Sequence, residues 1–154
     1  MNINPASKVL RGSDITLALT DDREYLSRLM RENRFNHLSD YGIRHYLNFV
    51  KYIWVGTTRG VVGGVLYFSL QPALQGWTFD AYKEDEKLKL LDNKGDWGYK
   101  ASLLVLDWFF RELIDDKVFA ILDIRNRGGI WLAKRLGFTT IRVESGFMTL
   151  RKER

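Results

Sequence analysis

The sequence has no cysteine and only two prolines among its 154 residues, and these shortages exclude several classes of protein. Without cysteine there is no disulfide scaffold, no thiolate metal site and no cysteine nucleophile. We therefore expect a cytoplasmic protein. Histidine is also scarce: His37 and His45 have no further ligands around them at metal-binding spacing. No metal site is predicted, and both histidines are expected on the surface or lining a site.

Long hydrophobic runs are missing as well. No apolar stretch approaches the roughly 20 residues that cross a bilayer, and residues 1–7 lack the basic and apolar parts of a signal peptide. A soluble, unexported chain is expected. The Gly-x-Ser-x-Gly elbow of serine hydrolases and the Gly-Lys-Ser/Thr of P-loop proteins do not occur either. The sequence therefore lacks the defining motifs of these two classes.

The chain does contain enough apolar material for a core. Hydrophobic residues make up 45% of the sequence and aromatic residues 14%, which suits one domain of ordinary size. No repeat, low-complexity segment or interdomain linker interrupts the chain. We expect residues 1–154 to form a single domain.

Positive charge is concentrated in the last part of the chain. The formal net charge is +5, but residues 1–124 carry 16 basic and 17 acidic side chains, whereas residues 125–154 carry 8 and 2. Clustered Lys and Arg attract phosphate groups, so this segment predicts contact with a phosphorylated cofactor or a nucleic acid. The alternative is a solvated basic surface that keeps the protein soluble.

Hydrophobic periodicity predicts a mixed order of strands and helices. The expected strands cover about residues 13–20, 52–56, 61–69, 77–82, 118–124, 138–143 and 147–151, and the expected helices about residues 21–33, 40–50, 95–114 and 126–136. The predicted apolar stripe of the longest helix consists of Leu103, Leu106, Phe110 and Leu113. Two glycines inside one strand, Gly63 and Gly64, indicate a β-bulge or a close approach to the backbone, with the bulge favoured.

The segment 125–138 joins a strand end, a short helix and a strand start. Asn126 is predicted to cap the helix by accepting the amide hydrogen of Gly129. Lys134 lies in the last turn, where positive charge meets the negative end of the helix dipole. Gly137 can adopt the left-handed conformation that ends a helix without steric cost.

This order of elements resembles the GNAT superfamily of N-acetyltransferases, in the form of a divergent member, over residues 14–152. Two segments carry the resemblance: the glycine-containing turn at 95–100 that opens the longest helix, and the capped helix at 126–138 that ends in Gly-Phe. The resemblance implies an α/β (α+β) fold whose mixed, mostly antiparallel central sheet has about six to seven strands and about four flanking helices. It also implies acetyl-CoA as co-substrate.

Backbone amides at the start of the central helix bind the pyrophosphate of acetyl-CoA in that family. Unpaired N–H groups and the positive end of the helix dipole converge on an anion there. The residues that the resemblance implies for acetyl-CoA binding are Phe79, Ala81, Gly95, Asp96, Trp97, Gly98, Tyr99, Lys100, Asn126, Arg127 and Lys134.

Acyl transfer to an amine needs a neutral amine, a polarised thioester carbonyl and a stabilised leaving thiolate. The resemblance implies that backbone amides at residues 79–81 meet the carbonyl. Asp80 and Glu84 are the candidate bases or amine anchors, the alternative for each being an ordinary solvated carboxylate. Tyr82 and Tyr99 are the candidate acids, the alternative being amphipathic packing.

The chain departs from the family pattern at three places. Asp92 and Asn93 stand where an Arg or Gln usually precedes the two glycines, and these glycines are one residue too far apart. Ala133 stands where many members have a Tyr that acts as the acid and protonates the leaving thiolate.

Three hypotheses follow. The leading one is an acetyl-CoA-dependent N-acetyltransferase that transfers the acetyl group directly to an amine of a small molecule or protein. The second is a catalytically degenerate protein of this fold that serves in an assembly, for example of a phage or virus particle, as a homo-oligomer or with a partner. The third is a nucleic-acid-binding module built on residues 125–154, in which Trp131 and Phe138 would stack on bases.

Overall fold

The computed structural model describes residues 8–88, 96–113 and 115–154. Within these ranges, eight strands form one sheet and five helices lie around it, so the strand count is slightly higher than expected. The strands are β1 (Val9–Arg11), β2 (Thr16–Thr20), β3 (Val50–Thr58), β4 (Val61–Gln71), β5 (Gly76–Lys83), β6 (Lys117–Asp123), β7 (Thr139–Glu144) and β8 (Phe147–Glu153). The helices are α1 (Arg23–Glu32), α2 (Asp40–Leu47), α3 (Asp85–Leu88), α4 (Trp97–Glu112) and α5 (Arg127–Arg135). In the part of the chain that is described, no helix is long and apolar enough to span a membrane.

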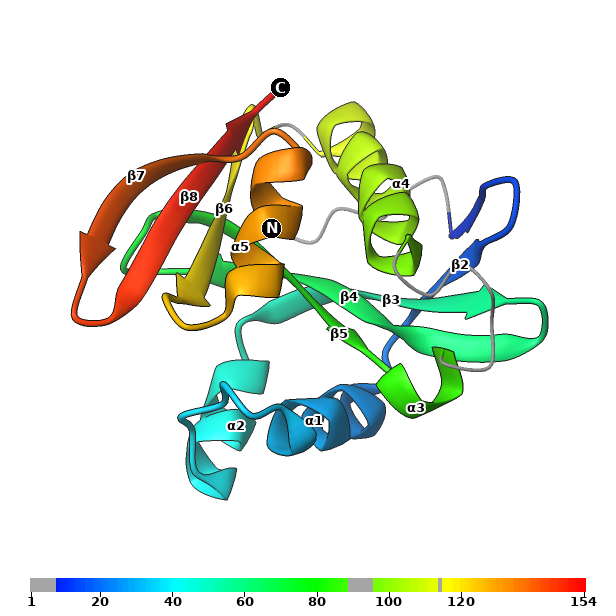
Figure 1. Ribbon diagram of the computed structural model, residues 1–154, viewed down its shortest axis with the longest axis horizontal. Helices are drawn as coiled ribbons and strands as arrows, with labels where there is room; N and C mark the ends of the chain where they lie inside the picture. Colours follow the sequence, from blue (N-terminus) through cyan, green and yellow to red (C-terminus); the bar gives the residue numbers. More distant parts are fainter. Residues whose placement is uncertain (1–7, 89–95, 114) are drawn as a thin grey trace.

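The sheet is mostly antiparallel, as expected. Its strand order is β1-β2-β3-β4-β5-β6-β8-β7, and β5–β6 is the parallel pair. The neighbouring strands β3 and β4 form an antiparallel hairpin, and the terminal strands β7 and β8 form another. The β5–β6 pair is in register at Thr78 opposite Phe119, and the two strands then diverge (Figure 1). The sheet is therefore open in its middle.

Helices cover both faces of the sheet, with α1 and α2 on one side and α4 and α5 on the other (Figure 1). Successive side chains of a strand point to opposite faces, and both sets are apolar in β3 and β4. Trp54 and Leu66 pack in the core that contains α4, whereas their neighbours Ile53 and Val65 pack in the core that contains α1. The same two strands thus supply two separate cores.

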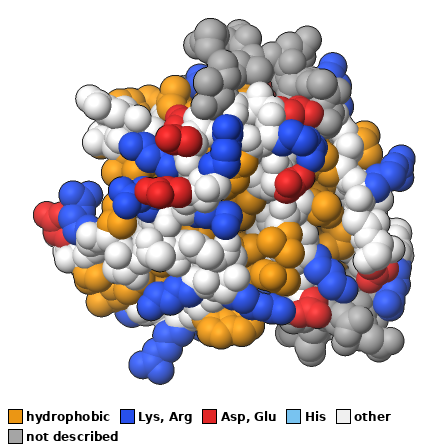
Figure 2. Space-filling view, turned by 90° about the horizontal axis from the view of Figure 1, so that it is seen from above, with side chains coloured by type: hydrophobic (Ala, Val, Ile, Leu, Met, Phe, Trp, Pro, Cys, Tyr) orange, Lys and Arg blue, Asp and Glu red, His pale blue; other side chains and the backbone are white. Residues whose placement is uncertain are grey.

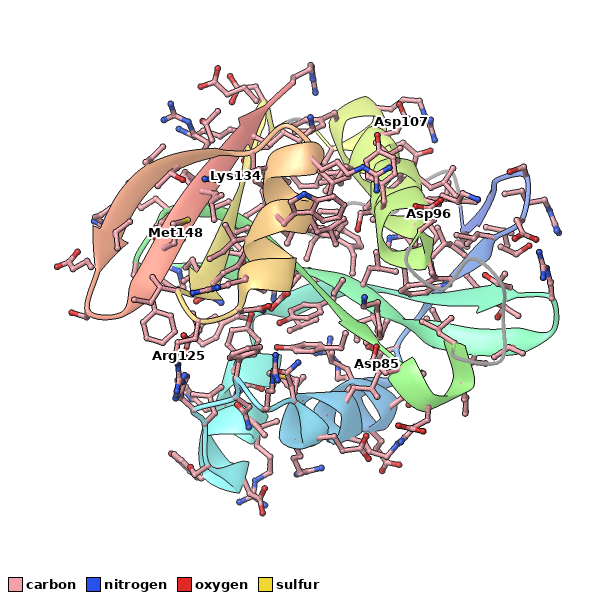
Figure 3. The ribbon with its side chains drawn as sticks, in the orientation of Figure 1. Asp85, Asp96, Asp107, Arg125, Lys134 and Met148 are labelled. Carbon is pink, nitrogen blue, oxygen red and sulfur yellow. The ribbon has the colours of Figure 1, made fainter. Side chains whose placement is uncertain are left out.

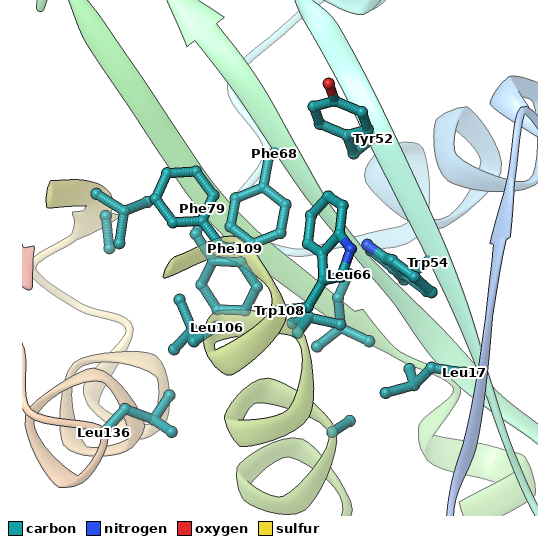
Figure 4. Packing of buried hydrophobic residues seen from close by; sticks show 14 of the residues in the cluster. Leu17, Tyr52, Trp54, Leu66, Phe68, Phe79, Leu106, Trp108, Phe109 and Leu136 are labelled. Carbon is teal, nitrogen blue, oxygen red and sulfur yellow. The ribbon is translucent and has the colours of Figure 1, made fainter. Parts of the chain in front are cut away.

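Aromatic rings dominate the core beneath α4 (Figure 4). Trp108 meets Trp54 edge to face with ring centroids 5.0 Å apart, and Phe109 stacks on Phe68 at 4.8 Å. All four side chains are fully buried. Aromatic pairs of this kind contribute about 0.5–1.5 kcal/mol each beyond the area they bury. They fix α4 on the strands next to the opening of the sheet.

The glycine pair in β4 combines the two predicted features. The register of β3 against β4 shifts beside it, and this shift makes Gly63 the extra residue of a β-bulge, as predicted. The backbone is also closely approached: a Cβ atom on Gly63 would collide with the indole Nε1 of Trp97, the first residue of α4. The bulge and the close approach therefore occur at the same residue.

The predicted apolar stripe of α4 is wrong at Leu103, which is 43% exposed. Leu106 and Leu113 of the stripe are buried as predicted, and the buried face also includes Trp97, Ala101, Val105 and Trp108. The indoles of Trp97 and Trp108 and the small side chain of Ala101 fix the rotation of the helix. The spacing of the leucines alone does not reveal this rotation.

Three smaller differences concern short elements. The strand β1 was not predicted because three residues are too few to show alternation, and its pairing with β2 stabilises it. The single-turn helix α3 falls in a stretch expected to be a charged connection. The predicted helix at 40–50 ends at Leu47, since Val50 already belongs to β3.

Candidate active site

The strands β5 and β6 diverge next to α5 (Figure 1). A cleft lined by residues of β5, α4 and α5 lies there. It contains a large cavity of about 700 Å³ between α1 and α3, and a narrow slot of about 80 Å³ between β5 and α5. A third, aromatic cavity of about 360 Å³ lies between β5 and the segment 33–38. Ala81 and Asn126 line all three spaces. They stand where the spaces meet.

Asn126 is fixed at this junction by its role as a helix cap. Its Oδ1 accepts the amide hydrogen of Gly129 at 2.9 Å, as predicted. A Cβ atom on Gly129 would lie 2.7 Å from the side-chain nitrogen Nδ2 of Asn126, so a side chain at position 129 would displace the cap. Gly137 has a φ of +98° and ends the helix in the predicted left-handed region. The local sequence thus determines where Asn126 stands.

Asp80 lies on β5 and lines both the slot and the aromatic cavity. Burial raises the pKa of its carboxyl group to about 6, and hydrogen bonds to the Ala81 amide and the Tyr82 side chain oppose this shift only in part. No ion pair links Asp80 to a Lys, Arg or His of the described residues. Asp80 is therefore a partly buried carboxyl group without a counter-ion among the described residues, at the centre of the cleft.

Three tyrosines surround Asp80. Tyr67 and Tyr82 stack with ring centroids 6.0 Å apart, and the Tyr46 hydroxyl lies 3.2 Å from that of Tyr67 and 3.3 Å from Ser69 Oγ. Burial raises the pKa of all three hydroxyl groups. They stay protonated at neutral pH, so they are hydrogen-bond donors.

Asp123 forms the opposite wall of the aromatic cavity, at the end of β6. Its carboxylate accepts hydrogen bonds from Arg125 Nη2 at 2.9 Å and Nε at 3.1 Å, and it lies 2.8 Å from His37 Nε2. The Arg125 guanidinium, its amide and His37 hold the pKa of Asp123 well below the usual range. Figure 3 shows Arg125 beside α2, at the outer end of this wall. Asp123 is thus fully paired.

Glu84, the other predicted base, is paired as well. Its Oε1 accepts hydrogen bonds from Arg28 at 2.7 Å and from the Tyr25 hydroxyl at 3.0 Å. Burial, together with the hydrogen bond to Glu84, raises the pKa of Tyr25. Glu84 lines the large cavity, but its main contacts tie α1 to the start of α3.

The slot brings together three positions that the sequence singled out. Phe79 and Ala81 line one side and Ala133 the other, so no tyrosine hydroxyl enters from the position where the family pattern has one. The Ala81 amide donates to its neighbour Asp80 Oδ1 at 2.8 Å, so it does not face β4. Ser102, fully buried on α4, also lines the slot, and its hydroxyl has no hydrogen-bond partner among the described residues.

The predicted cofactor-binding residues divide into two groups. Those that line the cleft are Phe79, Ala81, Gly98 and Asn126. Those that do not line its three cavities are Asp96, Trp97, Tyr99, Lys100, Arg127 and Lys134. Gly95 lies outside the described residues. The ring of the candidate acid Tyr99 is covered by the Arg135 guanidinium, whose Cζ lies 3.8 Å from the ring centroid. Tyr82, the other candidate acid, lines the large and aromatic cavities.

The charges in and around the cleft differ from the phosphate-attracting basic segment that the sequence predicts at residues 125–154. The large cavity is lined by more acidic than basic side chains: Glu32, Glu84, Asp85 and Glu86 against Arg34 and Lys83. Half of the eight basic side chains after residue 124 form ion pairs: Arg125 with Asp123, Arg135 with Asp96, Arg142 with Glu144, and Arg151 with Glu153. Viewed from above, blue and red side chains alternate over the surface (Figure 2). The excess of positive charge therefore does not form one continuous basic surface on this face.

Sequence reasoning missed several lining residues: Ser102, Tyr46, Tyr67 and Asp123. Tyr46 and Tyr67 looked like ordinary amphipathic core residues. Asp123 had a usable signal, since it is an acidic residue at the end of an otherwise apolar strand. His37, expected on the surface or lining a site, does line the aromatic cavity. No group of three or more His, Cys, Asp or Glu among the described residues could hold a metal ion.

Comparison with known proteins gives a clear answer at the level of structure. Neither a protein-family model nor a curated protein sequence matches the chain. Among solved structures, an acetyltransferase from Agrobacterium tumefaciens str. C58 is similar over 100% of this chain and 99% of its own, with a TM-score of 0.75 and 14% identity. A GNAT-family acetyltransferase from Bacillus anthracis matches over 94% and 98%, with a TM-score of 0.66 and 9% identity.

A third similar structure is a putative acetyltransferase from Salmonella typhimurium with its cofactor acetyl-CoA. It covers 92% of this chain and 94% of its own, with a TM-score of 0.62 and 16% identity. At these identities the similarity concerns the fold. The chain has the fold of the GNAT acetyltransferases, in a sequence that has diverged far from theirs.

Proposed function

We propose that this protein transfers an acetyl group from acetyl-CoA directly to an amine, with Asp80 as the base. The observation that carries the proposal is a partly buried carboxyl group without a counter-ion among the described residues, placed between a narrow slot and a wider cavity. A base needs a pKa near the working pH and an open approach to the proton that it removes. Asp80 meets both requirements better than Glu84, which Arg28 already neutralises.

The slot fits the thioester arm of acetyl-CoA in its chemistry. Its walls are mostly apolar, and the unpartnered Ser102 hydroxyl would gain a hydrogen bond from a polar group of that arm. The Ala81 amide, now bound to Asp80, and its neighbours on β5 would face the carbonyl oxygen. Gly98 and Gly128 would offer backbone amides at two helix N-termini to the phosphate end.

Acetyl-CoA supplies the activated acetyl group as a thioester. The amine nitrogen attacks the thioester carbon, an N–C bond forms, the C–S bond breaks, and the proton lost by the amine passes to Asp80. Asp80, with a pKa of about 6, is a stronger acid than a thiol with a pKa of roughly 8.5, so it can return that proton to the departing sulfur. Tyr82 would donate a hydrogen bond to the sulfur while it carries negative charge, since burial keeps this hydroxyl protonated.

Calorimetric titration with acetyl-CoA tests the first step of the proposal. We expect saturable binding in the micromolar range, which Ser102→Leu abolishes because its side chain fills the slot. Leu103→Gln is the matched control, since this exposed neighbour on α4 points away from the slot. Circular dichroism of both variants checks that the fold persists. Absence of heat at millimolar acetyl-CoA with the folded wild-type protein would refute the proposal.

A second candidate function is a non-enzymatic protein of this fold that acts in an assembly. The observation that favours it is the acidic lining of the large cavity, which would repel the phosphates of acetyl-CoA. A stable oligomer or a copurifying partner, together with no acetyl-CoA binding, would support this candidate. Under the leading proposal we expect one catalytic domain acting in the cytoplasm.

A further inference from the structure

The aromatic cavity has a composition unlike the rest of the chain, and it indicates which amine the protein accepts. This inference rests on the proposed function. The chain as a whole carries a formal charge of +5, yet no Lys or Arg of the described residues lines this cavity, while two carboxyl groups do. Six aromatic rings complete its walls: Phe35, Tyr46, Tyr67, Phe79, Tyr82 and Phe147. A cavity of this kind suits a cation that carries an apolar body.

Asp80 supplies the binding point for the cation. A buried carboxylate without a counter-ion is unfavourable, because the interior does not replace the hydration that it loses. A ligand ammonium group that enters the cavity would provide both the missing charge and hydrogen-bond donors. The groups that interact with Asp80 are the Ala81 amide on β5 and the hydroxyls of Tyr82, Tyr67 and Tyr46, none of which carries positive charge.

The tyrosines and phenylalanines would hold the rest of the ligand. Ring faces attract cations within about 6 Å of their centroids and also bury flat apolar groups. Tyr67 and Tyr82 lie nearly parallel, with an interplanar angle of 13°. Phe147, at the opposite wall, packs edge to face against His37. The cavity therefore offers ring surfaces on both sides of a ligand whose ammonium group lies at Asp80.

An anionic substituent on the ligand has no partner here. The His37 ring lines the cavity, but its Nε2 lies 2.8 Å from Asp123. The Arg125 guanidinium donates two side-chain hydrogen bonds to the same carboxylate and does not line the cavity. A carboxylate or phosphate on the ligand would therefore meet two carboxyl groups and, among the described lining residues, no basic group that is free of Asp123. The cavity of about 360 Å³ is also at the small end of the range for ligand sites, which is roughly 300–1,000 Å³.

We propose that the acceptor is a small primary amine with an aromatic or alkyl body and no acidic group, bound as an ammonium ion by Asp80 within the tyrosine cluster. Amino acids, amino-sugar phosphates and acidic peptides are then poor acceptors. The bound ammonium group first releases one proton to solvent, which gives the neutral amine that attacks. The second proton, lost as the N–C bond forms, is the one that Asp80 receives and returns to the departing sulfur.

Three matched ligands test this selection: phenethylamine, phenylalanine, which adds a carboxylate, and phenethyl alcohol, which lacks the charge. Binding to the protein is measured by calorimetry or by ligand-observed NMR without acetyl-CoA. We expect phenethylamine to bind at least tenfold more tightly than either analogue. Equal or tighter binding of phenylalanine would overturn the proposal.

Variants assign the binding to Asp80. Asp80→Asn should weaken phenethylamine binding at least tenfold, whereas Asp107→Asn, an exposed aspartate on α4, should leave it unchanged. Unchanged binding in Asp80→Asn would also overturn the proposal. The two proposals fail separately: binding of acetyl-CoA without any amine binding rejects the acceptor class alone. Amine binding without acetyl-CoA binding rejects the transferase alone and leaves the cation site in place.

Discussion

Two aspartates face each other across the aromatic cavity, and their surroundings differ sharply. Asp123, on the β6 wall, is held by Arg125 and His37, and the pKa of its carboxyl group is lowered. Asp80, on the β5 wall, has aromatic neighbours and no cation, and burial raises the pKa of its carboxyl group to about 6. The difference shows that burial alone does not decide the role of a carboxyl group. A cation in contact makes one aspartate structural, and the absence of a cation from the described surroundings leaves the other able to exchange a proton.

The largest expected effect comes from replacing Asp80, the aspartate without a counter-ion. Asp80→Asn should lower the rate of acetyl transfer by about 10²–10⁴-fold, the usual contribution of a general base. The unfolding midpoint at pH 7.5 should not fall, because the variant removes a buried charge that has no partner. Steady-state kinetics and thermal unfolding measure the two effects. Retention of more than a tenth of the wild-type rate would mean that Asp80 is not the base.

The second test is the pH dependence of stability. Between its ordinary pKa of 3.8 and its folded value of about 6, Asp80 binds more proton in the folded state, so the free energy of unfolding falls as pH rises through this window. The decrease is at most about 3 kcal/mol. Asp123 has the opposite sign, because its pKa is lowered on folding: its contribution is present above pH 3.8 and is lost as the pH falls below that value.

Urea unfolding between pH 3 and pH 7 separates the two aspartates. The free energy of unfolding of the wild type, minus that of Asp80→Asn, should decline from pH 4 to pH 6. The free energy of unfolding of the wild type, minus that of Asp123→Asn, should instead rise as the pH increases from 3 to 4. If the Asp80 difference is flat across its window, the carboxyl group is solvated. Under the proposed mechanism the transfer rate should rise through about pH 6, since the base must be ionised.

A new cation in the aromatic cavity should make Asp80 resemble Asp123. Leu38 lines this cavity and is 43% exposed, so Leu38→Lys places an ammonium group there without burying it in the core. We expect the KM for a cationic amine to rise about tenfold, which corresponds to about 1.4 kcal/mol. Leu38→Met is the control of similar length. Equal KM values for the two variants would indicate that the amine does not bind in this cavity.

The smallest effect concerns the unpartnered hydroxyl in the slot. Ser102→Ala removes a group that has no protein partner, so stability should hardly change, whereas acetyl-CoA affinity should fall by about threefold to tenfold, as for one lost hydrogen bond. Ser69→Ala is the contrasting case, because Ser69 already has partners in Tyr46 and Gln71 and should affect stability instead. A stability loss in Ser102→Ala with unchanged affinity would remove Ser102 from the site.

Local sequence signals predicted the framework well. Runs of apolar and aromatic residues bounded by turn residues identified β3, β4 and β5, and Asn126 with Gly129 and Gly137 marked both ends of α5 correctly. These features depend on neighbours a few residues apart, which a single sequence displays. The rotation of α4 was not predictable in the same way, since it depends on the fit of Trp97 and Trp108 against distant strands.

The site was predictable only in part. Asp80, Tyr82 and Glu84, three of the catalytic candidates of the sequence, all line the cleft, but the sequence could not separate the carboxyl group without a counter-ion from the paired one. The salt bridge between Glu84 and Arg28 joins residues 56 positions apart. The contact of His37 with Asp123 spans 86 positions. Such contacts set the pKa of each group, and only the folded chain brings them together.

The contact between Trp97 and the β3–β4 hairpin has a consequence for how this sequence can evolve. Glycines at 56 and 63 leave room for one indole ring, and that ring belongs to the first residue of the helix beside the cleft. A side chain at either glycine would be tolerated only together with a smaller residue at position 97. In relatives of this chain, these three positions should therefore change together or not at all, and that covariation would identify the same helix anchor in sequences too divergent to align by other means.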